Sequence, residues 1–211
     1  MRYIFFICLP LIFSSCSFFN SEKELGDYMQ WIHNEDNGLV KSKHINGLIF
    51  TVKYLPAEYM AYQELKDSNA HTISKDSLIK QYRNTLFFLL TVNSDDEMKE
   101  NAGKDVMYLG VKNPKEYQER VMLMNFNMKE FISIQLNDSS TYSPVLTNME
   151  NTYGLSNGRS ILCVFAPYKS IQEFNNSNTI DLIWDDEIFQ SGRNHFVFDS
   201  KDFLSLPRLK F

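Results

Sequence analysis

Glycine is scarce in this sequence, with eight residues among 211, and they do not form a cluster. A phosphate-binding loop built from backbone N–H groups needs several glycines in one short segment, so the sequence predicts no nucleotide site. The motifs Gly-x-Ser-x-Gly, Cys-x-x-Cys and His-Glu-x-x-His are also absent. These absences leave no recognisable serine nucleophile, redox pair or zinc protease site, and we expect no cofactor.

Positive charge is in the minority. The chain has 21 lysines and arginines against 26 aspartates and glutamates, for a formal net charge of −5. A nucleic-acid partner would need a basic patch to neutralise phosphates, and no basic tract is present, so we expect no nucleic acid as a partner. The lack of a basic amphipathic segment also disfavours electrostatic docking on an anionic membrane.

Histidine and cysteine are few and widely spaced. The four histidines are His33, His44, His71 and His195. No two of them lie within five residues of each other, so no zinc-type pair exists and we expect no metal site. Cys163 lies in the apolar segment 161–165, which predicts a buried, unreactive thiol rather than a nucleophile paired with His195. The sequence therefore leaves any catalytic residue unknown.

The first 16 residues have the pattern of a secretory leader. Arg2 precedes an apolar run from Ile4 to Phe13, and two small residues, Ser14 and Ser15, follow it. This order of charge, apolar run and small residues is typical of a signal peptide. The run has ten residues, whereas about 20 are needed to span a bilayer. We therefore expect a cleaved leader, not a membrane helix.

The segment Phe13-Ser14-Ser15-Cys16 resembles the cleavage motif of bacterial lipoprotein precursors, although Leu is more common than Phe at its first position. The resemblance covers these first 16 residues alone. It implies lipid attachment at Cys16 through a thioether-linked diacylglycerol, and anchorage to a cell-envelope membrane. Ser17, in place of Asp, favours the outer membrane and leaves open which side the protein faces. Ordinary secretion with cleavage nearby is the alternative.

The remaining chain is long enough for one domain with a large core. We expect a signal peptide at 1–15, the lipidated cysteine with a short tether at 16–20, and a single globular domain at 21–211. The pattern of alternating and helical apolar residues predicts an α+β domain, with a largely antiparallel sheet of six or more strands packed by three or four helices. A β-sandwich with peripheral helices is the alternative, because the second half is rich in strands.

Local signals define the expected elements. Ser21 and Glu24 have the spacing of a capping box before a helix, and Asn46-Gly47 favours a hairpin turn. Ser74 and Asn113-Pro114 are typical helix starts. The expected helices cover about 22–34, 56–65, 74–82 and 113–125, with a short helix or turn near the C-terminus. The expected strands cover 40–44, 48–54, 86–92, 106–111, 132–136, 144–149, 161–165, 180–184 and 195–198.

Two acidic groups follow predicted strands. Asp95-Asp96-Glu97 follows one strand, and Asp185-Asp186-Glu187 follows a strand that ends at Trp184. Carboxylates at a strand end could bind calcium or act as a glycosidase acid and base, although neither group has the spacing of a calcium loop. Trp184 could stack on a sugar, but it fits the core face of its strand better. Trp184, Asp185, Asp186 and Glu187 are thus weak candidates for a ligand site.

The sequence favours a lipid-anchored envelope protein of non-enzymatic function. Its partners would be the membrane, through the covalent lipid, and either another envelope protein or a small ligand. An envelope hydrolase acting on glycan or peptide, with carboxylates near Asp185–Glu187, is the alternative. A structural component of an envelope assembly is a third hypothesis.

Overall fold

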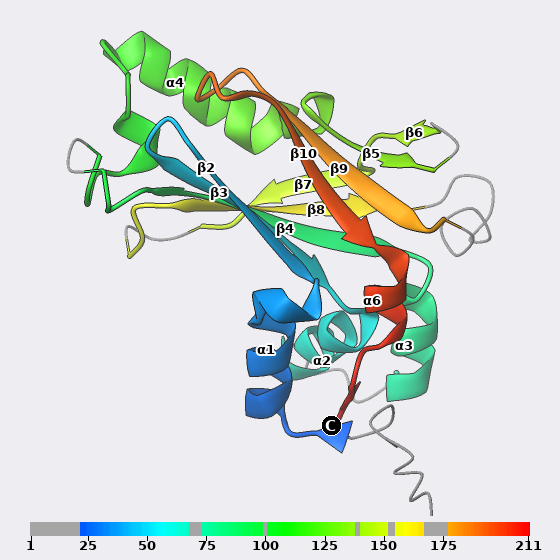
Figure 1. Cartoon of the computed structure of the whole chain (residues 1–211). Coiled ribbons are helices and arrows are strands. Elements are labelled where there is room, and N and C mark those ends of the chain that lie inside the picture. Colours follow the sequence, from blue (N-terminus) through cyan, green and yellow to red (C-terminus); the bar gives the residue numbers. More distant parts are fainter. Residues whose placement is uncertain (1–21, 68–72, 99–100, 138–139, 152–154, 167–176) are drawn as a thin grey trace, which may run out of the picture.

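The computed structural model describes residues 22–67, 73–98, 101–137, 140–151, 155–166 and 177–211. Within these ranges the chain forms two antiparallel sheets and a layer of helices (Figure 1). The predicted α+β fold with largely antiparallel pairing is confirmed. The leader, Cys16 and the tether lie outside the described residues. No helix in the described ranges is long and apolar enough to cross a membrane.

The first sheet has five strands in the order β2-β3-β4-β8-β7. The strands are β2 (Val40–Ile45), β3 (Leu48–Leu55), β4 (Leu86–Ser94), β8 (Arg159–Phe165) and β7 (Leu146–Met149). Asn46 and Gly47 both have positive φ, of 53° and 73°, as a tight turn between β2 and β3 requires. The apolar segment 86–92 lies in β4, between β3 and β8, so its prediction as a central strand is confirmed.

The second sheet has four strands in the order β10-β9-β5-β6. They are β5 (Ile132–Leu136), β6 (Thr141–Tyr142), β9 (Thr179–Asp186) and β10 (Gly192–Asp199). Its inner face packs on the first sheet. Phe50 contacts Trp184 with ring centroids 5.2 Å apart, and Phe88 contacts Phe198 at 5.3 Å. One apolar core therefore lies between two facing sheets, a feature that the alternative sandwich prediction shares.

The helices gather mainly at one end of the sheets (Figure 1). This group contains α1 (Leu25–His33), α2 (Ala57–Asp67), α3 (Lys75–Tyr82) and α6 (Ser200–Leu204). The helix α4 (Pro114–Met122) lies at the other end. The predicted caps form at two helices. Ser74 Oγ accepts a hydrogen bond from Ser77 N, and Asn113 Oδ1 accepts from Lys115 N and Glu116 N. Among the helices at the first end runs a two-stranded parallel pair, β1 (Glu22–Lys23) with β11 (Arg208–Leu209).

Two local predictions are wrong. The segment 106–111 is not a strand but begins with the 3-10 helix η2 (Val106–Tyr108), because the Asp105 carboxylate accepts from Met107 N and closes a helical turn. The helix predicted over 113–125 forms as α4, which ends at Met122, and continues as the π-helix η3 (Leu123–Asn127) and the 3-10 helix η4 (Met128–Glu130). Helix α1 begins at Leu25 with Glu24 at its N-cap, so the capping box does not form; Ser21 lies outside the described residues.

Candidate functional site

A cavity of about 540 Å³ lies where the group of helices meets the ends of the sheets. We call it the tyrosine cavity, because Tyr28 of α1 and Tyr54 of β3 both line it. Eight parts of the chain build its wall: α1, the end of β3, the start of α2, the end of α3, the starts of β4 and β9, α6 and the segment leading into β11. The other lining residues are Pro56, Ala57, Glu58, Ile79, Arg83, Asn84, Leu86, Ile180, Ser200, Phe203, Leu204, Leu206, Pro207 and Arg208.

Apolar and aromatic residues outnumber charged and polar residues among those that line the cavity. Tyr54 stacks on Phe203 with ring centroids 4.1 Å apart and planes 20° from parallel. The Tyr54 ring is also 5.7 Å from that of Phe88, which ties the wall to the main core. Stacked rings are rigid, so this side of the cavity is held in shape by packing.

Two buried hydroxyl groups at the cavity have no hydrogen-bond partner among the described residues. They are Tyr28 Oη and Ser200 Oγ. Tyr28 is 0% exposed. An unsatisfied buried hydroxyl costs about 1 to 3 kcal/mol, and such groups are rare in folded proteins. Both residues also line the cavity.

The Tyr28 hydroxyl keeps its proton at physiological pH. Burial raises the pKa of Tyr28 far above its ordinary value, and the negative charges of Glu58 and ionised Tyr54 raise it further. Burial also raises the pKa of Tyr54 to about 12. Both hydroxyl groups are therefore available as hydrogen-bond donors.

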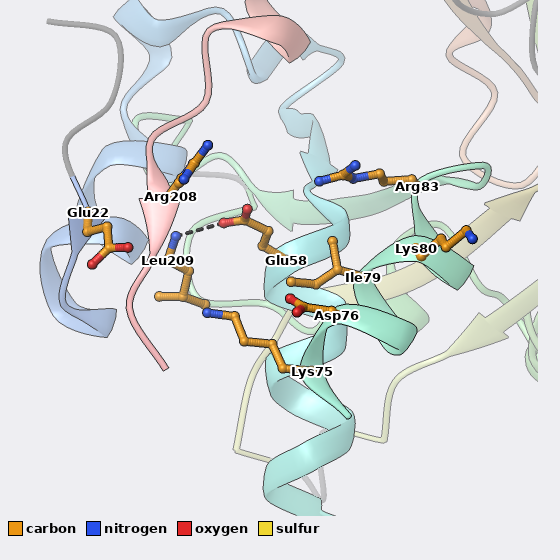
Figure 2. Close-up of a pocket in the computed structure, with 9 residues that line it drawn as sticks. All are labelled: Glu22, Glu58, Lys75, Asp76, Ile79, Lys80, Arg83, Arg208 and Leu209. Carbon is orange, nitrogen blue, oxygen red and sulfur yellow. Dashed lines mark hydrogen bonds between the residues drawn. The ribbon is translucent and has the colours of Figure 1, made fainter. Parts of the chain in front are cut away.

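Charged side chains surround the mouth of the cavity. Glu58, Arg83 and Arg208 line it together with an adjoining pocket of about 500 Å³, which is drawn in Figure 2. Glu58 Oε2 accepts a hydrogen bond from Leu209 N at 2.7 Å, which holds β11 beside α2. Arg83 and Arg208 are exposed and make no ion pair with any described residue. Their guanidinium groups are thus free to bind an anion.

The residues singled out from the sequence lie elsewhere. Trp184 is 0% exposed and packs on Phe50, so its interpretation as a core residue is confirmed and it cannot stack on a sugar. Asp186 is 2% exposed, and its carboxylate accepts from the N–H groups of Ile188, Phe189 and Ser191 and from Ser191 Oγ. It is occupied in closing the turn after β9.

Asp185 and Glu187 are exposed, because side chains alternate between the two faces along this segment. The three carboxylates therefore do not converge on one site, and the expectation of a ligand site at 184–187 is wrong for Trp184 and Asp186. In the other acidic group, Asp95 Oδ2 lies 2.8 Å from His44 Nδ1, and this hydrogen bond lowers the pKa of the Asp95 carboxyl.

Cys163 is fully buried, and its thiol donates to the carbonyl of Ile161. Burial raises the pKa of this thiol far above its ordinary value, so it stays protonated and unreactive. His195 is exposed on β10, and its Nδ1 lies 2.7 Å from Asp181 Oδ2. In the described part of the chain, no three His, Cys, Asp or Glu residues are placed to hold a metal ion.

Comparison with known proteins does not assign this chain to a family. No family model and no curated protein matches this chain. A solved structure, of a protein of unknown function from Burkholderia pseudomallei K96243, is similar over 86% of this chain and 88% of its own. The two sequences are 8% identical and the TM-score is 0.40, so this likeness carries no argument about function.

The sequence did not indicate the tyrosine cavity. Tyr28 has the spacing of a core residue in a helix, and it is buried as that spacing predicts. No sequence signal shows that its hydroxyl would end beside a cavity. Ser200, Arg83 and Arg208 belong to separate elements whose meeting depends on tertiary packing.

Proposed function

We propose that this protein is a lipid-anchored envelope protein that binds a small ligand in the tyrosine cavity without catalysing a reaction. The observation that carries the proposal is the fully buried Tyr28, whose unpartnered hydroxyl lies at a cavity. A polar group left in this state is stabilised when a ligand supplies its hydrogen bond.

The form of the cavity supports a binding role. Small-molecule sites have volumes of about 300 to 1,000 Å³, mostly apolar walls and a few polar groups that fix the ligand's orientation. The tyrosine cavity has a volume in this range, and its lining combines apolar residues with several polar and charged ones. No nucleophile with an adjoining base lies among its lining residues, and the alternative hydrolase gains no support from the dispersed carboxylates at 185–187.

The proposed lipid on Cys16 would bring this end of the molecule close to a membrane. Glu22 lies six positions after Cys16, since 22 − 16 = 6. A fully extended segment of that length spans about 20 Å. Glu22 lines the pocket that adjoins the cavity, so the cavity would lie on the membrane-proximal side.

The anchor is tested by the intact mass and membrane partition of the native protein beside a Cys16→Ala variant. The expected native protein begins at Cys16, carries diacylglycerol mass and stays with membranes, whereas the variant is unlipidated. A native protein without lipid, found in the soluble fraction, would overturn the anchor.

The binding role is tested with the apolar dye 8-anilinonaphthalene-1-sulfonate and the full chain carrying Cys16→Ala. We expect one dye per chain, and loss of binding when Ala57→Trp fills the cavity. Leu155→Trp is the matched control, because Leu155 is 91% exposed and does not line the cavity. Equal dye binding by both tryptophan variants, with unchanged melting temperatures, would refute the proposed site.

A further inference from the structure

The polar groups around the tyrosine cavity are mainly hydrogen-bond donors. The hydroxyl groups of Tyr28 and Ser200 have no partner among the described residues, and the guanidinium groups of Arg83 and Arg208 can only donate. Glu58 can only accept, and it already accepts from the backbone of β11. The hydroxyl groups and Asn84, which also lines the cavity, can accept as well as donate, so the two arginines are the groups that need acceptor oxygens from a ligand.

The net charge of the side chains that line the cavity favours an anionic ligand. Two arginines and one glutamate line the cavity, which leaves one positive charge in excess (2 − 1 = 1). The adjoining pocket adds Lys75, Lys80, Glu22 and Asp76, whose charges cancel and so leave the sign unchanged. An arginine at a partly shielded site binds carboxylate and phosphate oxygens through paired N–H groups. The excess matches a ligand with a single negative charge.

The apolar residues of the wall favour a ligand that also carries a hydrocarbon chain. Apolar residues of this wall come from α6, the segment before β11 and the first residues of β4 and β9: Leu86, Ile180, Phe203, Leu204, Leu206 and Pro207. Leu204 is 83% exposed. An apolar chain lying against this wall would remove such surface from water.

We infer that the tyrosine cavity binds a single-chain amphiphile that carries one negatively charged head group, and this inference rests on the proposed function. The exposed Arg83 and Arg208 place the head at the mouth, and a head-group oxygen that reaches inward accepts from the buried Tyr28. The hydrocarbon chain lies against Phe203 and its apolar neighbours. A position beside the membrane would give such a molecule a short path to the cavity.

The probe is decanoate, titrated by calorimetry below its micellar concentration into the full chain carrying Cys16→Ala. We expect saturable binding of one decanoate, and affinity that falls about fourfold for each methylene removed from the chain. Decyltrimethylammonium has the same chain and the opposite charge, so it should bind at least tenfold more weakly.

Three variants locate the head group. Arg83→Gln and Arg208→Gln should each weaken decanoate binding about tenfold, since each removes charge-assisted hydrogen bonds. Arg193→Gln is the matched control and should change nothing, because Arg193 is an exposed arginine at the opposite end of β10 from Ser200. Tyr28→Phe should weaken binding about fivefold without lowering the melting temperature of the ligand-free protein, because the lost hydroxyl has no partner there.

Several results would overturn the inference. Equal binding of decanoate and decyltrimethylammonium would do so, as would unchanged affinity in both cavity arginine variants. Binding to phosphatidylglycerol vesicles without binding to free decanoate would point to a bilayer surface instead. If the dye enters the cavity and decanoate does not, the inference fails and the proposed function stands. If neither enters, both fail.

Discussion

Asp185 and Asp186 are adjacent in the sequence and differ in nearly every physical respect, so the pair allows a sharp test of the fold. Asp186 is buried and closes the turn after β9 with four accepted hydrogen bonds of 2.6 to 3.0 Å. Asp185 is exposed. Asp186→Ala and Asp185→Ala therefore remove the same group from two opposite environments.

The cost of Asp186→Ala follows from its donors. The N–H of Ile188 is buried, so losing its acceptor costs about 1 to 3 kcal/mol. The N–H groups of Phe189 and Ser191 are partly buried and can turn to water, at about 0.5 to 1 kcal/mol each. We expect the free energy of unfolding to fall by about 3 kcal/mol. Asp185→Ala should change it by less than about 0.5 kcal/mol.

A neighbouring cation adds to this cost. The Arg120 guanidinium donates to the carbonyls of Val106 and Leu109 at 2.9 and 2.7 Å, and its carbon lies 5.1 Å from the Phe189 ring centre. Burial lowers the pKa of Arg120, and the negative charge of Asp186 opposes that shift. Removing Asp186 therefore leaves a half-buried cation with less compensation.

The assay is urea unfolding of the two variants and the parent, followed by tryptophan fluorescence. Trp184 is buried beside this turn and reports its opening. Asp186→Asn should lie between the parent and Asp186→Ala, since an amide keeps one acceptor oxygen. Equal midpoints for Asp185→Ala and Asp186→Ala would refute the reasoning, because they would mean that the buried hydrogen bonds contribute nothing.

Three further predictions concern other parts of the molecule. Tyr54 has a pKa of about 12 in the folded protein, so the unfolded chain loses the Tyr54 proton at a lower pH than the folded protein does. The free energy of unfolding should therefore fall as the pH rises from 10 towards 12. In alkaline urea titrations, Tyr54→Phe should make this decrease smaller by about 2 kcal/mol. The hydrogen bond to His44 lowers the pKa of Asp95 in the folded protein. This hydrogen bond therefore stabilises the fold at pH values above the ordinary pKa of an aspartate, and its contribution is lost as acid protonates Asp95 in the folded state. His44→Ala should make the decrease in the free energy of unfolding from about pH 5 to about pH 3 smaller, and an unchanged slope would count against this pair. Gly158→Ala would place a methyl carbon 2.7 Å from a backbone carbonyl oxygen of β4 and should cost about 2 kcal/mol, whereas Gly26→Ala, which meets nothing within 4 Å, should be neutral or stabilising.

The strands were predictable because their burial alternates. In β3, Leu48, Phe50, Val52 and Tyr54 share one face in the sequence, and all four are buried in the structure. The hairpin turn at 46–47 and the cap at Ser74 were predictable from single residues with strong local preferences.

The errors occur where long-range contacts override local patterns. The segment 106–111 has apolar residues that suit a strand, yet the Asp105 carboxylate and the Arg120 side chain bind it as a turn. The division of the strands between two sheets depends on pairings across the chain, such as β5 with β9. The acidic residues at 185–187 do not form one carboxylate group, and sequence alone does not show that Asp186 would turn inward.

The tyrosine cavity could not be predicted from local sequence patterns, because it too depends on contacts between distant parts of the chain. Tyr28 and Ser200 are separated by most of the described chain, and each fits an ordinary role in its own helix. What makes them notable is a missing hydrogen bond, and that can be recognised only after all neighbouring groups are placed.

The parallel pairing of β1 with β11 has a consequence for how the protein is made. Leu209 donates to Glu58 across 151 positions of the sequence, and Lys210 reaches Glu24 across 186. Contacts so distant in the sequence form late, because a long loop must close first. During synthesis, one wall of the tyrosine cavity is therefore missing until residues 206–209 have emerged. A nascent chain stalled before that point would leave part of the apolar lining of the cavity open to solvent.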